Sequence, residues 1–163
     1  PAPAEVMGRR DYYVFRYLAS PPEYHASSGD EYYLEYGYAY IQLFTQLGID
    51  NPDLGPFVTG TGIALQRLFE QELRLNPAAL KSRATVRGIA FGTHDQAYRA
   101  GGLGRLSAGQ ALSVWWVAAQ RGDAFSGAAL REAAQSWDGA ASILHREMVN
   151  GLAPTLTPIG GPR

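Results

Sequence analysis

The strongest constraint on the fold is a helical period that runs from residue 33 to residue 47. Apolar side chains recur there every three or four positions, which places them on one side of an α-helix; they are Tyr33, Tyr36, Tyr40, Ile41, Phe44 and Leu47. Ser28 followed by Glu31 has the spacing of an N-terminal capping box, and Gly48 is a stop signal. The pattern therefore predicts a helix after Ser28 whose apolar side, including these three tyrosines, is buried.

Two further segments have helical patterns of the same kind. Residues 11–19 are helical or extended, with helix favoured, and Pro21 and Pro22 stop the segment. Residues 56–75 carry a regular apolar side and end at Asn76-Pro77, so they are predicted to form a long helix.

The second half of the chain is also helical in pattern, with interruptions. Residues 78–99 are predicted to form two helices or one broken helix, and Thr93 followed by Gln96 offers a new capping box inside that stretch. Gly101-Gly102 stops the segment. Ser107 with Gln110 is a further capping box, which begins a helix that contains a Trp-Trp pair.

The fold class follows from this pattern and from the lack of strand signals. A last helical region covers residues 126–150, and no stretch alternates apolar and polar β-branched residues. We therefore expect an all-α protein, with about six or seven helices in a bundle-like array. The expected division is one compact helical domain over 11–151, a linker-like segment over 1–10, and an irregular Pro/Gly-rich tail over 152–163.

Composition excludes several classes of function. The 163 residues contain no cysteine, which rules out thiol catalysis, zinc fingers and disulfides. The 14 basic and 15 acidic residues nearly cancel and are spread along the chain, so a nucleic-acid partner is not expected. The sequence shows neither a signal peptide nor an apolar run of the ~18 residues that span a membrane. A soluble protein is expected, either cytoplasmic or exported within a larger system.

Four residues are the candidates for acid–base chemistry. His25, Asp30 and Glu31 lie just before the tyrosine-rich helix, and His94 lies at a predicted helix start where the helix dipole would favour its neutral form. If the fold brings them to one cleft with aromatic walls, they could process a small molecule or a glycan. For each residue alone, a surface or packing role is the commoner outcome.

Neither a metal nor a cofactor is expected. Glu31 and Glu35 share a helix face, but the Glu-x-x-His pattern that accompanies such carboxylates in metal-binding bundles is missing. The glycines of residues 55–62 resemble a phosphate loop only superficially, because the Lys-Ser/Thr ending is absent. Their expected role is a turn or a close helix contact.

Tyrosines also suggest a surface for a protein partner. Nine of the ten tyrosines lie between residues 12 and 40. If the apolar side of the predicted helix is buried, Tyr24, Tyr32 and Tyr38 are left for the surface, and Trp116 is the Trp-Trp member expected at a helix edge or interface.

Two functions are therefore open at this point. The first is a helical interaction or assembly module that binds a protein partner, or itself, through the tyrosine-rich face. The alternative is a hydrolase- or lyase-type enzyme domain of the bacterial effector or toxin kind, which would use His25, Asp30, Glu31 and His94.

Overall fold

The computed structural model describes residues 1–119, which are helical along most of their length. No strand occurs within these residues, which confirms the all-α class. None of the helices in this part of the chain is both long and apolar enough to cross a membrane. The helices are α1 (Asp11–Leu18), α2 (Pro22–Ala26), the π-helix η2 (Tyr33–Tyr38), α3 (Ala39–Asp50), α4 (Gly55–Leu75), α5 (Arg83–Gly92), α6 (His94–Gly101) and α7 (Ala108–Ala119). The predicted helical region over 126–150 lies outside the described residues.

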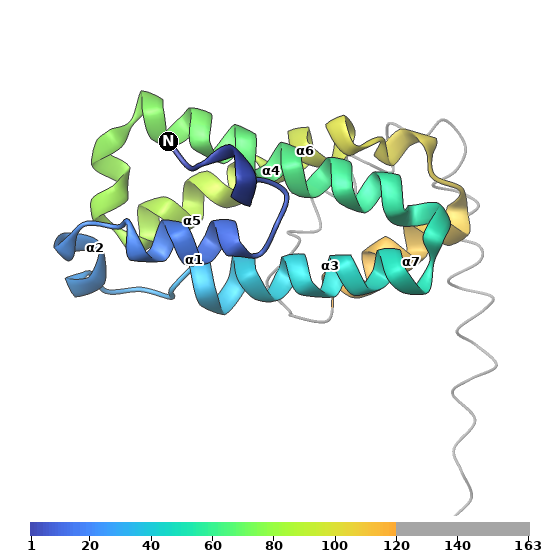
Figure 1. Cartoon of the computed structure of the whole chain (residues 1–163), viewed down its shortest axis with the longest axis horizontal. Coiled ribbons are helices and arrows are strands. Elements are labelled where there is room, and N and C mark those ends of the chain that lie inside the picture. Colours follow the sequence, from blue (N-terminus) through green and yellow to red (C-terminus); the bar gives the residue numbers. More distant parts are fainter. Residues whose placement is uncertain (120–163) are drawn as a thin grey trace, which may run out of the picture.

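The helices pack side by side along a common direction (Figure 1). The long helix α4 lies against α6 and α3, while α1 packs on η2 and α7 packs on α3. Short 3-10 turns join several of these elements, among them η1 (Ala4–Val6) and η4 (Pro77–Lys81). The result is an elongated bundle in which α4 contacts elements from both halves of the described chain.

Tyrosine rings form much of the core. One cluster lies among α1, α2, η2, α3, α4 and α5, and its large buried members are Tyr12, Tyr13, Tyr24, Tyr32, Tyr33, Ile41, Phe69, Leu73 and Val86. A second cluster joins α3, α4, α6 and α7 through Tyr40, Phe44, Leu47, Leu54, Phe57, Val58, Tyr98 and Val114. Each tyrosine supplies a large apolar ring with a polar tip, so a core of this kind depends on satisfying the hydroxyl groups as well as on packing.

Several helix limits agree with the sequence patterns. The helices α1 and α4 occupy the predicted segments, and residues 78–99 contain two helices, α5 and α6. Gly102 ends α6 with φ of 97°. The Ser107–Gln110 capping box is confirmed, because the Ser107 N–H donates to Gln110 Oε1 at 2.9 Å and the Gln110 N–H donates to Ser107 Oγ at 3.3 Å.

Two other predicted caps are wrong. The tyrosine-rich helix begins at Tyr33, so Ser28 lies too far upstream to cap it. Thr93 has helical backbone angles, and its hydroxyl donates to the carbonyl of Ala90 at 2.7 Å and makes no cap for α6. A Thr hydroxyl can bond backward along the chain, and it does so here because α5 and α6 follow one another with almost no gap.

Glycines allow two close contacts that larger residues would block. A Cβ atom at Gly101 of α6 would lie 1.9 Å from Thr61 Oγ1 of α4, so the two helices can approach closely only at a glycine. Gly60 of α4 faces the same crossing, since a Cβ atom there would lie 3.4 Å from Gly101 Cα. The glycines of residues 55–62 thus lie within α4, where Gly60 and Gly62 serve close helix contacts, whereas a Cβ atom at Gly55 would meet nothing within 4 Å.

Replacing Gly37 with alanine is expected to destabilise the protein by about 1–3 kcal/mol, because the added methyl group overpacks the core. An ideal Cβ atom at Gly37 lies 2.3 Å from the buried ring of Tyr13, which is enclosed by other core residues. Urea denaturation would measure the change. Gly88→Ala in α5 is the matched control, since its Cβ would meet nothing within 4 Å. Equal losses for the two variants would contradict this account.

Candidate functional site

His25 and Asp30 lie at the surface, His25 in α2 and Asp30 on the segment that leads from α2 to η2. The His25 ring packs edge-on against Tyr17, with 4.9 Å between ring centroids. The carboxylate of Asp30 pairs with Arg87 of α5. Arg83 donates to the carbonyl groups of His25, at 3.3 Å, and Gly29, at 3.5 Å. Both candidates therefore belong to a surface on which α5 arginines hold the preceding loop.

Glu31 has a structural role at the start of η2. Its carboxylate accepts hydrogen bonds from the backbone N–H groups of Tyr33, at 2.8 Å, and Leu34, at 2.5 Å. It also accepts from the hydroxyl of Tyr24, at 2.5 Å. Burial and the Glu31 carboxylate raise the pKa of Tyr24, so this hydroxyl remains a donor. A buried carboxylate that accepts these bonds caps the helix directly, in place of Ser28.

His94 lies in the interior, at the first position of α6. Burial lowers the pKa of His94 to about 4, so the imidazole is neutral at pH 7. Desolvation lowers this pKa, whereas the sequence had suggested that the helix dipole would keep the imidazole neutral. The ring centroid lies 5.0 Å from that of Phe91 and 6.3 Å from that of Tyr98, one turn further along α6.

A small aromatic cavity borders His94. Its wall comes from α1, η2, α3, α4 and α6 and includes Tyr36, Tyr40, Thr61 and Tyr98, but neither His25, Asp30 nor Glu31. The cavity volume is about 20 Å³. That is room for about one water molecule, far below the roughly 300–1,000 Å³ of small-molecule sites. This cavity, formed by described residues, is therefore too small for a substrate and does not join His94 to the other three candidates.

The π-helix explains why tyrosines gather on this wall. The carbonyl of Tyr32 accepts from the N–H of Gly37, five residues on, at 2.7 Å, and from the N–H of Tyr36 at 3.2 Å. This wide turn adds a residue to the inward-facing side, and the Tyr32 ring stacks on Tyr36 at 5.6 Å between centroids. Tyr40 continues the stack at 4.6 Å from Tyr36.

The expectation that Tyr24 and Tyr32 lie at the surface is wrong, because both rings are buried in the core. Tyr38 is half-buried, and the guanidinium of Arg10 lies 5.7 Å from its ring centroid. Trp116 belongs to α7, but its side chain is outside the part of the chain that the structure describes. Of the four proposed partner-binding residues, Tyr38 alone keeps a described, partly accessible side chain.

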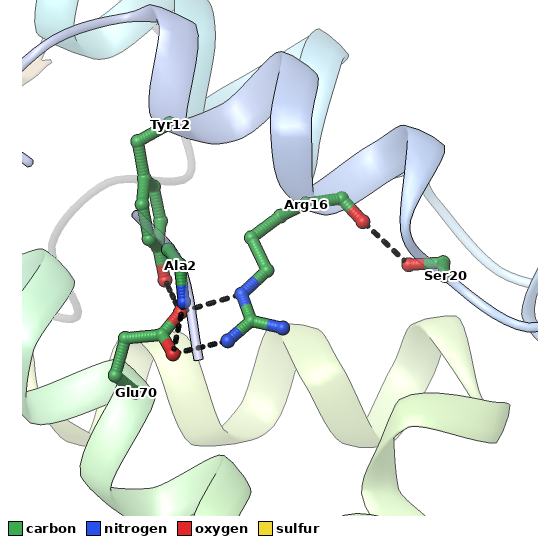
Figure 2. Close-up of polar contacts among 5 residues, drawn as sticks. All are labelled: Ala2, Tyr12, Arg16, Ser20 and Glu70. Carbon is green, nitrogen blue, oxygen red and sulfur yellow. Dashed lines mark hydrogen bonds and ion pairs between the residues drawn. The ribbon is translucent and has the colours of Figure 1, made fainter. Parts of the chain in front are cut away.

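The core of the described residues also contains a buried ion pair that the sequence patterns did not predict. Glu70 of α4 pairs with Arg16 of α1, and both side chains are buried (Figure 2). The hydroxyl of Tyr12 donates to Glu70 Oε1 at 2.9 Å, and the N–H of Ala2 donates to Glu70 Oε2 at 3.1 Å. Burial opposes ionisation of Glu70, but the Arg16 partner outweighs it and lowers the pKa of the carboxyl.

Among the described residues, no three His, Asp or Glu side chains are grouped so that they could hold a metal ion. Comparison with known proteins finds no matching family model, no similar curated protein and no similar solved structure. The arguments about function therefore rest on the geometry of this chain.

Proposed function

We propose that the protein is a helical interaction module and that the outer side of α1 binds a protein partner. The observation that carries this proposal is that α1 is apolar on both sides. Its inner side buries Tyr12, Tyr13 and Arg16. Its outer side carries Val14 and Phe15, which are half-buried, and Leu18, which is 73% exposed. A helix that is apolar all round is normally covered on all sides.

The outer residues lie at the correct spacing for a continuous patch. Positions 14, 15 and 18 fall on one helix face, since residues three and four apart are neighbours. Within residues 1–119, none of the three belongs to a core cluster or packs against one. Asp11 is the exposed residue on the same face at the helix start. An apolar patch with a charged edge has the make-up of a protein–protein contact.

The enzyme alternative has weaker support from the same geometry. Glu31 caps η2, Asp30 pairs with Arg87, and the cavity beside His94 has room for about one water molecule. A general acid or base must reach its substrate within about 3 Å, directly or through one water. Because Glu31 and Asp30 already make structural contacts, the geometry favours a binding function over a catalytic one.

Substitution of Leu18 by glutamate is expected to abolish partner binding while the fold is retained. A charge placed in an apolar contact must be desolvated without a partner, which costs several kcal/mol of binding free energy. Proteins that co-purify with the tagged chain from its source cells, identified by mass spectrometry after cross-linking, provide the measurement. Sedimentation of the purified chain tests whether the partner is a second copy.

Ile49→Glu is the matched control, because Ile49 is also an aliphatic residue, 65% exposed, on the last turn of α3. We expect this variant to keep the partners that Leu18→Glu loses. If both variants retain the same set of cross-linked proteins, the outer side of α1 is not the binding surface and the proposal fails.

A further inference from the structure

Two residues that line the aromatic cavity have buried hydroxyl groups with no hydrogen-bond partner among the described residues. They are Tyr36 of η2 and Thr61 of α4. Nearly all buried polar groups in proteins are paired, either with the protein or with ordered water, because an unpaired group loses the hydrogen bonds that it makes in solvent. Two such groups around one cavity therefore indicate a shared partner that does not come from the described chain.

The Thr61 hydroxyl lies at the crossing of α4 and α6. A Thr hydroxyl within a helix often bonds back to a carbonyl group of the preceding turn, but that of Thr61 makes no such bond with any described residue. On α6 it faces Gly101, because a Cβ atom there would lie 1.9 Å from Thr61 Oγ1. Glycine has no side chain that could bond to this hydroxyl. Thr61 is 1% exposed, so bulk solvent does not reach it either.

The Tyr36 hydroxyl is available as a hydrogen-bond donor. Burial raises the pKa of Tyr36, and the neighbouring Tyr40 raises it further, so the hydroxyl keeps its proton. The rings of Tyr36 and Tyr40 stack with 4.6 Å between centroids. Even so, neither Tyr40 nor another described residue completes a hydrogen bond with the Tyr36 hydroxyl.

The cavity that these residues share matches one water molecule in size. Its volume is about 20 Å³, and roughly 10–15 Å³ is the least space that holds a water molecule. Cavities that stay dry in proteins have apolar walls, whereas His94, Tyr40 and Tyr98 add further polar side chains to this wall. Both the size and the chemistry of the cavity therefore favour water over a void.

We infer that this cavity binds one ordered water molecule, which joins η2 to α4 through the hydroxyl groups of Tyr36 and Thr61. The water accepts from the Tyr36 hydroxyl and bonds to the Thr61 hydroxyl, which can donate or accept. A bridging water is nearly as favourable in enthalpy as a direct hydrogen bond. The water is thus a structural ligand at the place where η2, α3, α4 and α6 meet. The inference is independent of the outer side of α1.

A crystal structure of the full chain, at a resolution that shows ordered water, tests this site directly. We expect one water molecule within about 3 Å of both Tyr36 Oη and Thr61 Oγ1. The double variant Tyr36→Phe, Thr61→Val keeps the ring and the branched side chain but removes both hydroxyl groups. It should lose this water, because the water then lacks the two groups that bind it.

Tyr33→Phe is the matched control. Tyr33 also belongs to η2 and has a buried hydroxyl group, but it does not line the cavity. This variant should keep the water between Tyr36 and Thr61. A wild-type structure without water at this position overturns the proposal, and so does a double variant that retains it. If the double variant does not fold, each single substitution takes its place and should lower the occupancy of the water.

Discussion

Replacing Glu70 with alanine is expected to destabilise the protein by about 3–5 kcal/mol, because Arg16 is then left buried without its carboxylate partner. Both side chains are buried between α1 and α4, and the same carboxylate also accepts from Tyr12 and Ala2. The change removes three sets of contacts that join the N-terminal segment, α1 and α4. Chemical denaturation followed by circular dichroism would measure the free energy of unfolding.

Two controls identify the buried charge as the cause. The double variant Arg16→Met, Glu70→Leu removes both charges and should recover much of the loss, since apolar residues of similar volume often replace a buried pair well. Glu23→Ala breaks the exposed pair with Lys81 and should leave stability nearly unchanged. A double variant as unstable as Glu70→Ala would show that the shape of the site, and not the unpaired arginine, sets the cost.

Acidification from pH 6.5 to pH 4 is expected to remove about 3 kcal/mol of stability through His94 alone. Burial lowers the pKa of His94 from 6.5 to about 4 in the folded protein. In this window the unfolded chain binds a proton at this histidine and the folded chain does not, so protons favour unfolding. The contribution is complete above pH 6.5, is lost as the pH falls, and levels off below about pH 4.

Comparison of variants isolates this contribution from other acid-sensitive groups such as Glu70. The stability of His94→Gln should depend less steeply on pH than that of the wild type between pH 6.5 and pH 4, because glutamine does not titrate. NMR titration of the imidazole provides a direct check. A His94 that titrates near pH 6.5 in the folded protein would contradict the expectation.

The positions of the helices could be predicted from the sequence because they depend on the local spacing of apolar residues and on the residues that end a helix. The limits of α1 and α4 and the Ser107–Gln110 box follow from neighbouring residues alone. The caps at Ser28 and Thr93 failed because residues close to them in the sequence offered competing hydrogen bonds. Glu31 caps η2 with its own carboxylate, and Thr93 bonds back to Ala90.

The candidate site was harder to predict because burial decides the role of each group. Tyr32 lies at the edge of the apolar side that Tyr33, Tyr36 and Tyr40 define, and its ring is buried by packing against the rings of Tyr13, Tyr36 and Phe69. His94 was selected as a neutral histidine, which agrees with its lowered pKa, but the cause is desolvation and not the helix dipole. The distances between its segment and those of His25 and Glu31 depend on packing, which a single sequence does not encode locally.

The amino-acid sequence by itself determined that this protein is all-α, free of cysteine chemistry, and rich in tyrosine between residues 12 and 40. These properties depend on composition and on period along the chain. Only the tertiary structure decided that most of those tyrosines form the core, that Glu70 and Arg16 meet 54 residues apart, and that Leu18 of α1 is exposed. The physical reason is that the spacing of apolar residues specifies which side chains are buried, whereas the hydrogen-bonding partner of each polar group depends on how the helices pack.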